Sequence, residues 1–95
     1  MENKLIPHIE KIRDEISIKY RANIEEINRI SKLIIKTKAE IKQNKNILHT
    51  AFVYLTYQVD ELIQQRNNLL FYNDGLYEAR EIVMDYVVRL LKEMK

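Results

Sequence analysis

Apolar residues recur along the chain at the three- and four-residue spacings of amphipathic helices. In the N-terminal part they are Ile9, Ile12, Ile16, Tyr20, Ile24 and Ile27. From there onward an apolar residue returns at every seventh position, as in a coiled coil. These positions are Ile27, Ile34, Ile41, Leu48, Leu55, Leu62, Leu69, Leu76, Val83 and Leu90. The pattern therefore predicts long helices that pack along heptad seams.

The second position of each heptad is less regular. Three residues after the apolar series stand Thr37, Asn44, Gln58 and Gln65, which are poor core residues, besides apolar ones such as Ile30. This mixture does not fit one continuous two-stranded seam. We expect instead a helical hairpin or bundle whose helices change partners along their length.

Two segments are expected to interrupt the helices. Asn44, Lys45 and Asn46 follow a polar stretch, and asparagine favours caps and turns. Asn73, Asp74 and Gly75 include the only glycine, which can take the left-handed conformation that ends a helix. The predicted helices cover about 6–43, 47–72 and 76–94, in a single domain over 1–95. The alternative is a first helix that continues unbroken through Asn46.

The predicted helix lengths indicate an elongated molecule. A helix over 6–43 is about 57 Å long, whereas a compact chain of this size has a radius of gyration of about 12–13 Å. A second helix over 47–72 reaches back only to about residue 18. Ile9, Ile12 and Ile16 then need a third helix or another chain to cover them. The predicted fold is all-α: an elongated helical hairpin plus a third helix, in a coiled-coil-like bundle completed by oligomerisation, as a dimer.

The middle of the chain is rich in apolar and aromatic residues. Residues 51–55 are all apolar, and five adjacent residues cover the whole circumference of a helix. Phe52 shares a face with Leu55 and is expected in the core, whereas Tyr54 and Tyr57 lie on another face, which either packs internally or binds a partner. The candidate protein interface comprises Ile9, Ile12, Ile16, Tyr54 and Tyr57.

Charge is balanced overall but not locally. Sixteen Lys and Arg against fourteen Asp and Glu give a net charge of +2, too small to indicate a partner. Between residues 29 and 45 six cations stand against Glu40 alone. They are Arg29, Lys32, Lys36, Lys38, Lys42 and Lys45. The first three and the last three fall on nearly opposite sides of a helix, so a solvated surface is expected, with nucleic-acid contacts or docking to an acidic protein patch as alternatives.

Residues with catalytic potential are few and scattered. The sequence has no cysteine, which excludes disulfides, thiol catalysis and cysteine zinc sites. His8 and His49 stand in no metal-binding spacing, and adjacent acidic residues on a helix diverge by about 100°. We therefore expect no enzyme activity, cofactor or metal. Apolar stretches are far shorter than the roughly 18 residues of a membrane span, so we expect a cytoplasmic protein without a membrane partner, or one of the host cytoplasm if viral.

These patterns favour a non-enzymatic protein–protein interaction module that acts through helical apolar and aromatic surfaces, as an adaptor, chaperone or inhibitor. Its partners would be a second copy of itself and another protein. The Ile-, Lys- and Asn-rich composition is common in bacterial and viral genomes, where such a module would be an accessory protein. The alternative is a nucleic-acid-binding regulator that uses residues 29–45. A third hypothesis is a helical enzyme with one site per dimer.

Overall fold

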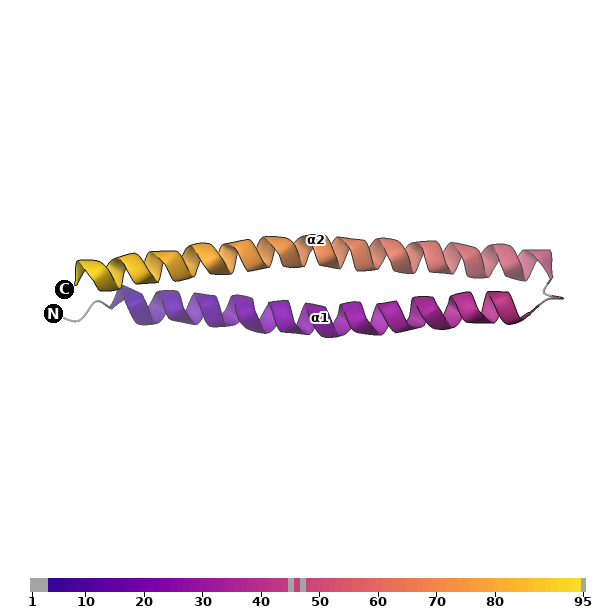
Figure 1. Ribbon diagram of the computed structural model, residues 1–95, viewed down its shortest axis with the longest axis horizontal. Helices are drawn as coiled ribbons and strands as arrows, with labels where there is room; N and C mark the ends of the chain where they lie inside the picture. The colour runs from indigo at the N-terminus through magenta and orange to yellow at the C-terminus, as the bar shows by residue number, and fades with distance from the viewer. Residues whose placement is uncertain (1–3, 45, 47, 95) are drawn as a thin grey trace.

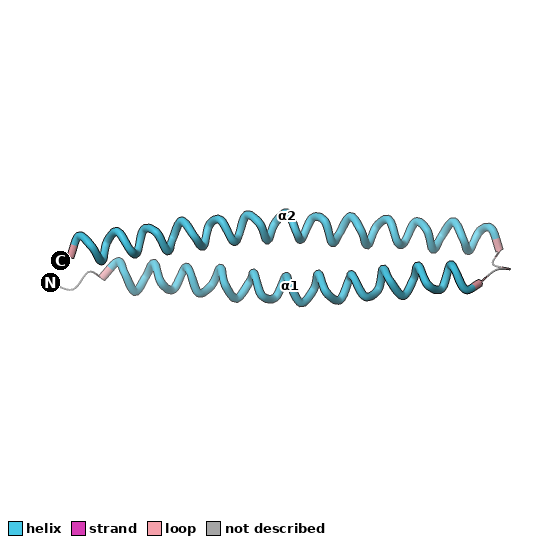
Figure 2. Tube along the Cα trace, in the orientation of Figure 1, coloured by secondary structure: helices cyan, strands magenta, loops and turns pink. Residues whose placement is uncertain are grey.

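The computed structural model describes residues 4–44, 46 and 48–94, and these form an antiparallel helical hairpin (Figure 1). Helix α1 spans Leu5–Gln43 and helix α2 spans His49–Glu93. The described residues outside the two helices are short caps and turns, and none of the described residues forms a strand (Figure 2). The hairpin measures 74 × 14 × 14 Å. The prediction of an elongated all-α hairpin is therefore confirmed.

The hairpin turn lies where the asparagine-rich segment predicts it. Asn44 caps the C-terminal end of α1, and its backbone N–H and side-chain Nδ2 both donate to the carbonyl oxygen of Glu40, at 3.2 and 3.0 Å. Leu48 is extended and directly precedes α2. The predicted break at 44–46 is confirmed at Asn44 and Asn46, whereas Lys45 lies outside the described residues.

The prediction of a third helix is wrong, because α2 continues without a break through residues 73–75. Gly75 has a negative φ, so it does not take the left-handed conformation that ends helices. Asn73 is buried, and its amide bonds to α1 instead of capping a helix end. A helical glycine costs about 1 kcal/mol relative to alanine, and a long packed helix tolerates that cost. The segments predicted as 47–72 and 76–94 are one helix.

The continuous α2 also removes the predicted overhang of α1. Its C-terminal half lies along the N-terminal half of α1, as the contact between Arg13 and Met84 shows. Ile9 and Ile16 are consequently half-buried, and Ile12 stays exposed. The isoleucine stripe that was expected to need a further helix or chain is covered in part by the same hairpin.

A single heptad seam joins the helices over nearly their whole length, so the predicted change of partners is wrong. Every position of the seam is buried or half-buried. In α1 the seam consists of Ile6, Ile9, Arg13, Ile16, Tyr20, Asn23, Ile27, Ile30, Ile34, Thr37 and Ile41. In α2 it consists of Leu55, Val59, Leu62, Arg66, Leu69, Asn73, Leu76, Arg80, Val83, Val87 and Leu90. In α2 the second seam position of each heptad therefore lies four residues after the first, and not three residues after it. Val59, Arg66 and Asn73 occupy this second position.

The hydrophobic core is thin. Ile30, Ile34 and Val59 form its buried cluster, and Val87 is buried nearer the other end. The radius of gyration is 21.3 Å, against about 12 Å for a compact domain of this length. The accessible surface is 7882 Å², against about 5,800 Å² for a compact monomer of this mass. A single hairpin therefore leaves much of its apolar surface in contact with solvent.

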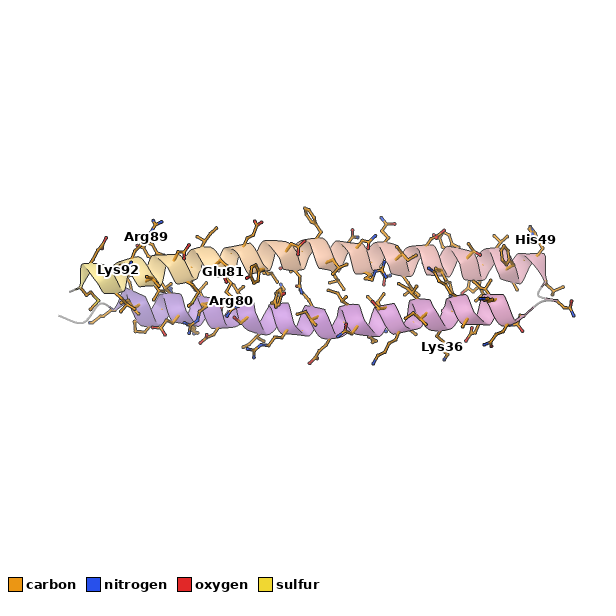
Figure 3. All side chains as sticks on the ribbon, viewed as in Figure 1. Lys36, His49, Arg80, Glu81, Arg89 and Lys92 are labelled. Atoms are coloured by element: carbon orange, nitrogen blue, oxygen red, sulfur yellow. The ribbon has the colours of Figure 1, made fainter. Side chains whose placement is uncertain are left out.

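Neither α1 nor α2, as far as the structure describes them, contains a stretch apolar and long enough to cross a bilayer. The partly apolar surface of the hairpin is instead interrupted by charged residues along both helices, as the side chains in Figure 3 illustrate.

Candidate protein-binding surface

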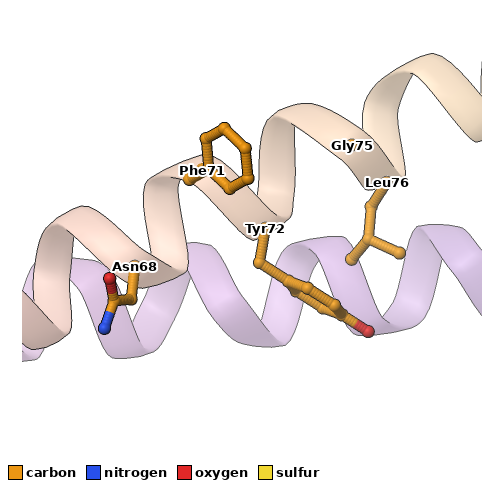
Figure 4. Close-up of a pocket in the computed structure, with 5 residues that line it drawn as sticks. All are labelled: Asn68, Phe71, Tyr72, Gly75 and Leu76. Carbon is orange, nitrogen blue, oxygen red and sulfur yellow. The ribbon is translucent and has the colours of Figure 1, made fainter.

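The most exposed large apolar side chain in the described part of the chain is Phe71, in the middle of α2, at 82% exposure. Its ring points away from α1 (Figure 4). An exposed aromatic side chain that adjoins other exposed apolar surface belongs to the kind of patch that marks an interaction site. Phe71 is therefore the first residue of the candidate surface.

An open hollow of about 490 Å³ adjoins Phe71 (Figure 4). Asn68, Phe71, Tyr72, Gly75 and Leu76 line it. The hollow exists because Gly75 has no side chain, and a Cβ added there would meet no atom within 4 Å. None of the described residues thus requires glycine at this position for close packing. Alanine at position 75 would give a more stable helix. The open space beside Gly75 therefore favours a site into which a side chain of another molecule fits.

The neighbouring Tyr72 is held against α1. The Nζ atom of Lys19 lies 5.3 Å from the centroid of the Tyr72 ring, within the range of a cation–π contact. On the other side of the seam the rings of Tyr20 and Tyr77 lie 6.3 Å apart and tilted by 45°. The contact with Lys19 fixes one wall of the hollow, because it limits the freedom of Tyr72 to move.

Tyr54 and Tyr57 extend the exposed aromatic surface toward the hairpin turn. Gln58 Nε2 donates to the hydroxyl oxygen of Tyr54 at 2.9 Å. The hydroxyl of Tyr57 bonds to the Glu61 carboxylate, and this hydrogen bond, together with the negative charge, raises the pKa of Tyr57. Both tyrosines are exposed and lie on a different face from buried Val59, as the helical phase predicts.

Phe52 departs from the prediction. It lies on the seam side of α2 but is exposed. The contact between Asn23 and Asn73 sets the register of the hairpin and places Phe52 opposite Asn44, where α1 has already ended. Helix α1 therefore does not extend alongside Phe52.

The structure does not bring the predicted interface residues together. Ile9, Ile12 and Ile16 lie near the start of α1, whereas Tyr54 and Tyr57 lie near the hairpin turn at the other end (Figure 1). Ile9 and Ile16 are partly used by the seam of the hairpin itself. The two tyrosines remain available for a partner, and Phe71 and Gly75 join them.

The basic segment is divided over the surface of α1. Arg29, Lys32 and Lys36 line one open hollow, and Lys36 points away from α2 (Figure 3). Arg29 is already paired with Glu26: its Nε lies 2.9 Å from Oε2, and a second nitrogen contacts Oε1. The hydrogen bond lowers the pKa of Glu26 and raises that of Arg29. This hollow therefore offers two unpaired candidates for phosphate contact, Lys32 and Lys36.

The remaining cations of that segment are elsewhere. Lys38 and Lys42 lie on the other side of α1 by helical phase, and Lys45 falls outside the described residues. The two histidines are near opposite ends of the hairpin, with His49 at the first turn of α2 (Figure 3). Over residues 4–44, 46 and 48–94, no three acidic or histidine side chains are placed to hold a metal ion.

Polar residues inside the seam were not anticipated from the sequence. Asn23 Nδ2 donates to Asn73 Oδ1 at 2.8 Å, and Asn73 Nδ2 donates to the Tyr20 carbonyl oxygen at 3.1 Å. In the described part of the chain, the Nε atoms of Arg66 and Arg80 are buried without a hydrogen-bond partner. If the second seam position of α2 is placed four residues after the heptad leucine, Arg66, Asn73 and Arg80 all fall in the seam.

The hairpin geometry was compared with known proteins. No protein-family model, curated protein or solved structure matches this chain. The exposed surfaces of the hairpin, above all the aromatic side of α2, are therefore its candidate functional features.

Proposed function

We propose that this protein is a non-enzymatic protein–protein interaction module, an adaptor, chaperone or inhibitor of the bacterial or viral accessory type. It binds another protein through the aromatic surface of α2, which comprises Tyr54, Tyr57, Phe71 and Tyr72. The observation that carries the proposal is the 82% exposure of Phe71 beside the hollow at Gly75. An exposed aromatic anchor next to an open apolar hollow is the arrangement that supplies most of the binding energy in protein interfaces.

The tyrosines support the same proposal. Tyrosine and phenylalanine add contact area with few rotatable bonds, so burying them costs little conformational entropy. The hydrogen bond that Tyr54 accepts from Gln58 and the one between Tyr57 and Glu61 restrict the two rings further. A partner that docks along this side of α2 meets rings that are already ordered.

Affinity capture from the native host tests the proposal. The wild type, Phe71→Ala and a matched control, Ile82→Ala, are immobilised and compared at 0.5 M salt. Ile82 is also exposed on α2 but lies outside the hollow. We expect a partner that the wild type and Ile82→Ala retain and that Phe71→Ala loses. Retention of the same proteins by all three would contradict a role for Phe71.

The alternative is a nucleic-acid-binding regulator, and the hollow that Arg29, Lys32 and Lys36 share favours it. Each phosphate contact releases counterions, so the affinity would fall steeply as salt rises. A Lys32→Gln/Lys36→Gln variant that no longer retards DNA or RNA, where the wild type does at physiological salt, would give this alternative the lead. Binding through the aromatic surface should instead persist in high salt.

A further inference from the structure

One flank of α2, beside the seam, is apolar over most of its length. It consists of Ile63, Leu70, Tyr77, Met84 and Leu91, each directly after a leucine or valine of the seam. Leu70, Tyr77 and Leu91 are 44%, 49% and 48% exposed. In a two-stranded coiled coil the flanking positions are usually charged, whereas apolar flanks mark a helix that faces the core of a larger bundle. We call these five residues the flank stripe.

The adjoining side of α1 is suited to close packing. Ser17 and Arg21 of α1 share a hollow with Met84 of the flank stripe, which places these residues on the same side of the hairpin. One and two heptads after Ser17 stand Ile24 and Ser31. Ser17 and Ser31 are small and Ile24 is apolar, so this side of α1, beside the large residues of α2, allows a second layer of helices to interdigitate.

We propose that a second copy of this chain covers the flank stripe, so that two hairpins form a four-helix bundle with both hairpin turns at the same end. The inference rests on the proposed function as an interaction module and names one of its partners. A face of 74 by 14 Å gives about 1,000 Å² per copy, so two copies bury about 2,000 Å² in total, which is the size of a stable interface.

Charge decides the orientation of the second copy. Helix α1 carries nine Lys and Arg against six Asp and Glu, a net charge of +3, and α2 carries four against seven, a net charge of −3. With the turns at the same end, each α1 lies antiparallel against the α2 of the other copy. With the turns at opposite ends, α1 lies on α1 and α2 on α2, which brings like charges together.

The register of the hairpin supports the same orientation. The bond between Asn23 and Asn73 sets which residues of the two helices are level. A two-fold axis along the bundle repeats this alignment between copies. Arg21 then lies within one residue of the level of Asp74 of the other copy. This pair lies at the border of the flank stripe and combines opposite charges.

Sedimentation equilibrium tests the interface. We expect about 23 kDa for the wild type at 50 µM, twice the 11.5 kDa of the chain. Leu70→Glu/Leu91→Glu should weaken dimerisation at least tenfold and keep its helical circular dichroism, while Ile82→Glu, about 120° around α2 from Leu70, should stay dimeric. A monomeric wild type would overturn the proposal, as would dissociation by Ile82→Glu with the stripe variant still dimeric.

Spin-label distances test the orientation in the wild-type fold. The chain has no cysteine, so Thr50→Cys supplies a single label near the turn. We expect the two labels within about 40 Å, because packed helices lie 8–10 Å apart. A distance near the 74 Å length of the hairpin overturns the same-end arrangement.

The two proposals fail separately. A dimer in which Phe71→Ala changes no protein binding argues against the proposed function alone. A monomer that still binds a protein through Phe71 overturns the dimer alone.

Discussion

The side-chain amide of Asn23 donates a 2.8 Å hydrogen bond to Oδ1 of Asn73, which is only 4% exposed between the two helices. Asn73 also donates to the Tyr20 carbonyl oxygen, so both ends of its amide are paired. A slip of one heptad would place Asn73 level with Ile16 or Ile30 and leave the amide unpaired. The asparagine pair therefore fixes the alignment of α1 and α2.

A double-mutant cycle measures this contact. We expect Asn73→Ala to lower the free energy of unfolding by about 2 kcal/mol, because it leaves a cavity and an unpaired amide on Asn23. Asn23→Ala should cost less, because Asn73 keeps its bond to Tyr20. Urea denaturation of both single variants and the double variant should give a coupling energy of about 1 kcal/mol. Additive effects would show that the hydrogen bond does not hold the register.

The hairpin was predictable from the sequence, but its continuity was not. Heptad leucines and the asparagine-rich turn give two long helices without further information. Asn73 and Gly75 look like a helix end because asparagine and glycine favour caps, and intrinsic propensity does not reveal that a residue has a partner on the other helix. The tertiary bond to Asn23 turns a residue typical of turns into a core residue.

The candidate surface was predictable only in part. Helical phase correctly separates Tyr54 and Tyr57 from Val59. It could not show that Ile9 and Ile16 are covered, since that depends on where α2 ends. Phe71 and Gly75 form part of a candidate site only because α2 is continuous. The continuous helix places Gly75, which has no side chain, beside the exposed ring of Phe71. The local sequence identifies the apolar and aromatic residues that could bind a partner. The packing of α2 on α1 decides which of them stay exposed.

The core prediction compares two isoleucines of α1 that lie five residues apart. Ile30 is buried in the cluster with Ile34 and Val59, whereas Ile35 is exposed. We expect Ile30→Ala to destabilise the hairpin by about 2–5 kcal/mol, as loss of a buried side chain does. Ile35→Ala should change the stability by no more than about 0.5 kcal/mol. Equal effects in thermal denaturation would contradict the seam.

The basic segment should contribute little to folding. Lys32, Lys36, Lys38 and Lys42 are exposed on α1 and form none of the described salt bridges. We expect their combined change to Gln to leave the melting temperature nearly unaltered, because surface substitutions away from specific contacts usually cost less than about 0.5 kcal/mol each. Calorimetry checks this, and a large drop would mean that these side chains have structural partners.

The ionisation of Tyr57 should report its contact with Glu61. The hydrogen bond to the carboxylate raises the pKa of Tyr57, so the folded state favours the protonated phenol. The contribution to stability is present below the unfolded pKa and is lost as the pH rises through the folded pKa. We expect Glu61→Gln to lower the pKa of Tyr57, measured by NMR titration of its ring carbon. An unchanged pKa of Tyr57 in Glu61→Gln would contradict this contact.

Gly75→Ala separates stability from binding at the hollow. A Cβ at this position meets no atom within 4 Å, so alanine fits the helix without strain. We expect the free energy of unfolding to rise by about 1 kcal/mol, since alanine is the better helix former, and the melting temperature to rise by about 4–8 °C. The added methyl group projects beside Phe71 and should weaken capture of the protein partner. Asn67→Ala, outside the hollow, is the control: it should stabilise α2 and leave capture unchanged. If Gly75→Ala stabilises the hairpin and binds the partner as well as the wild type does, the hollow at Gly75 is not part of the binding surface.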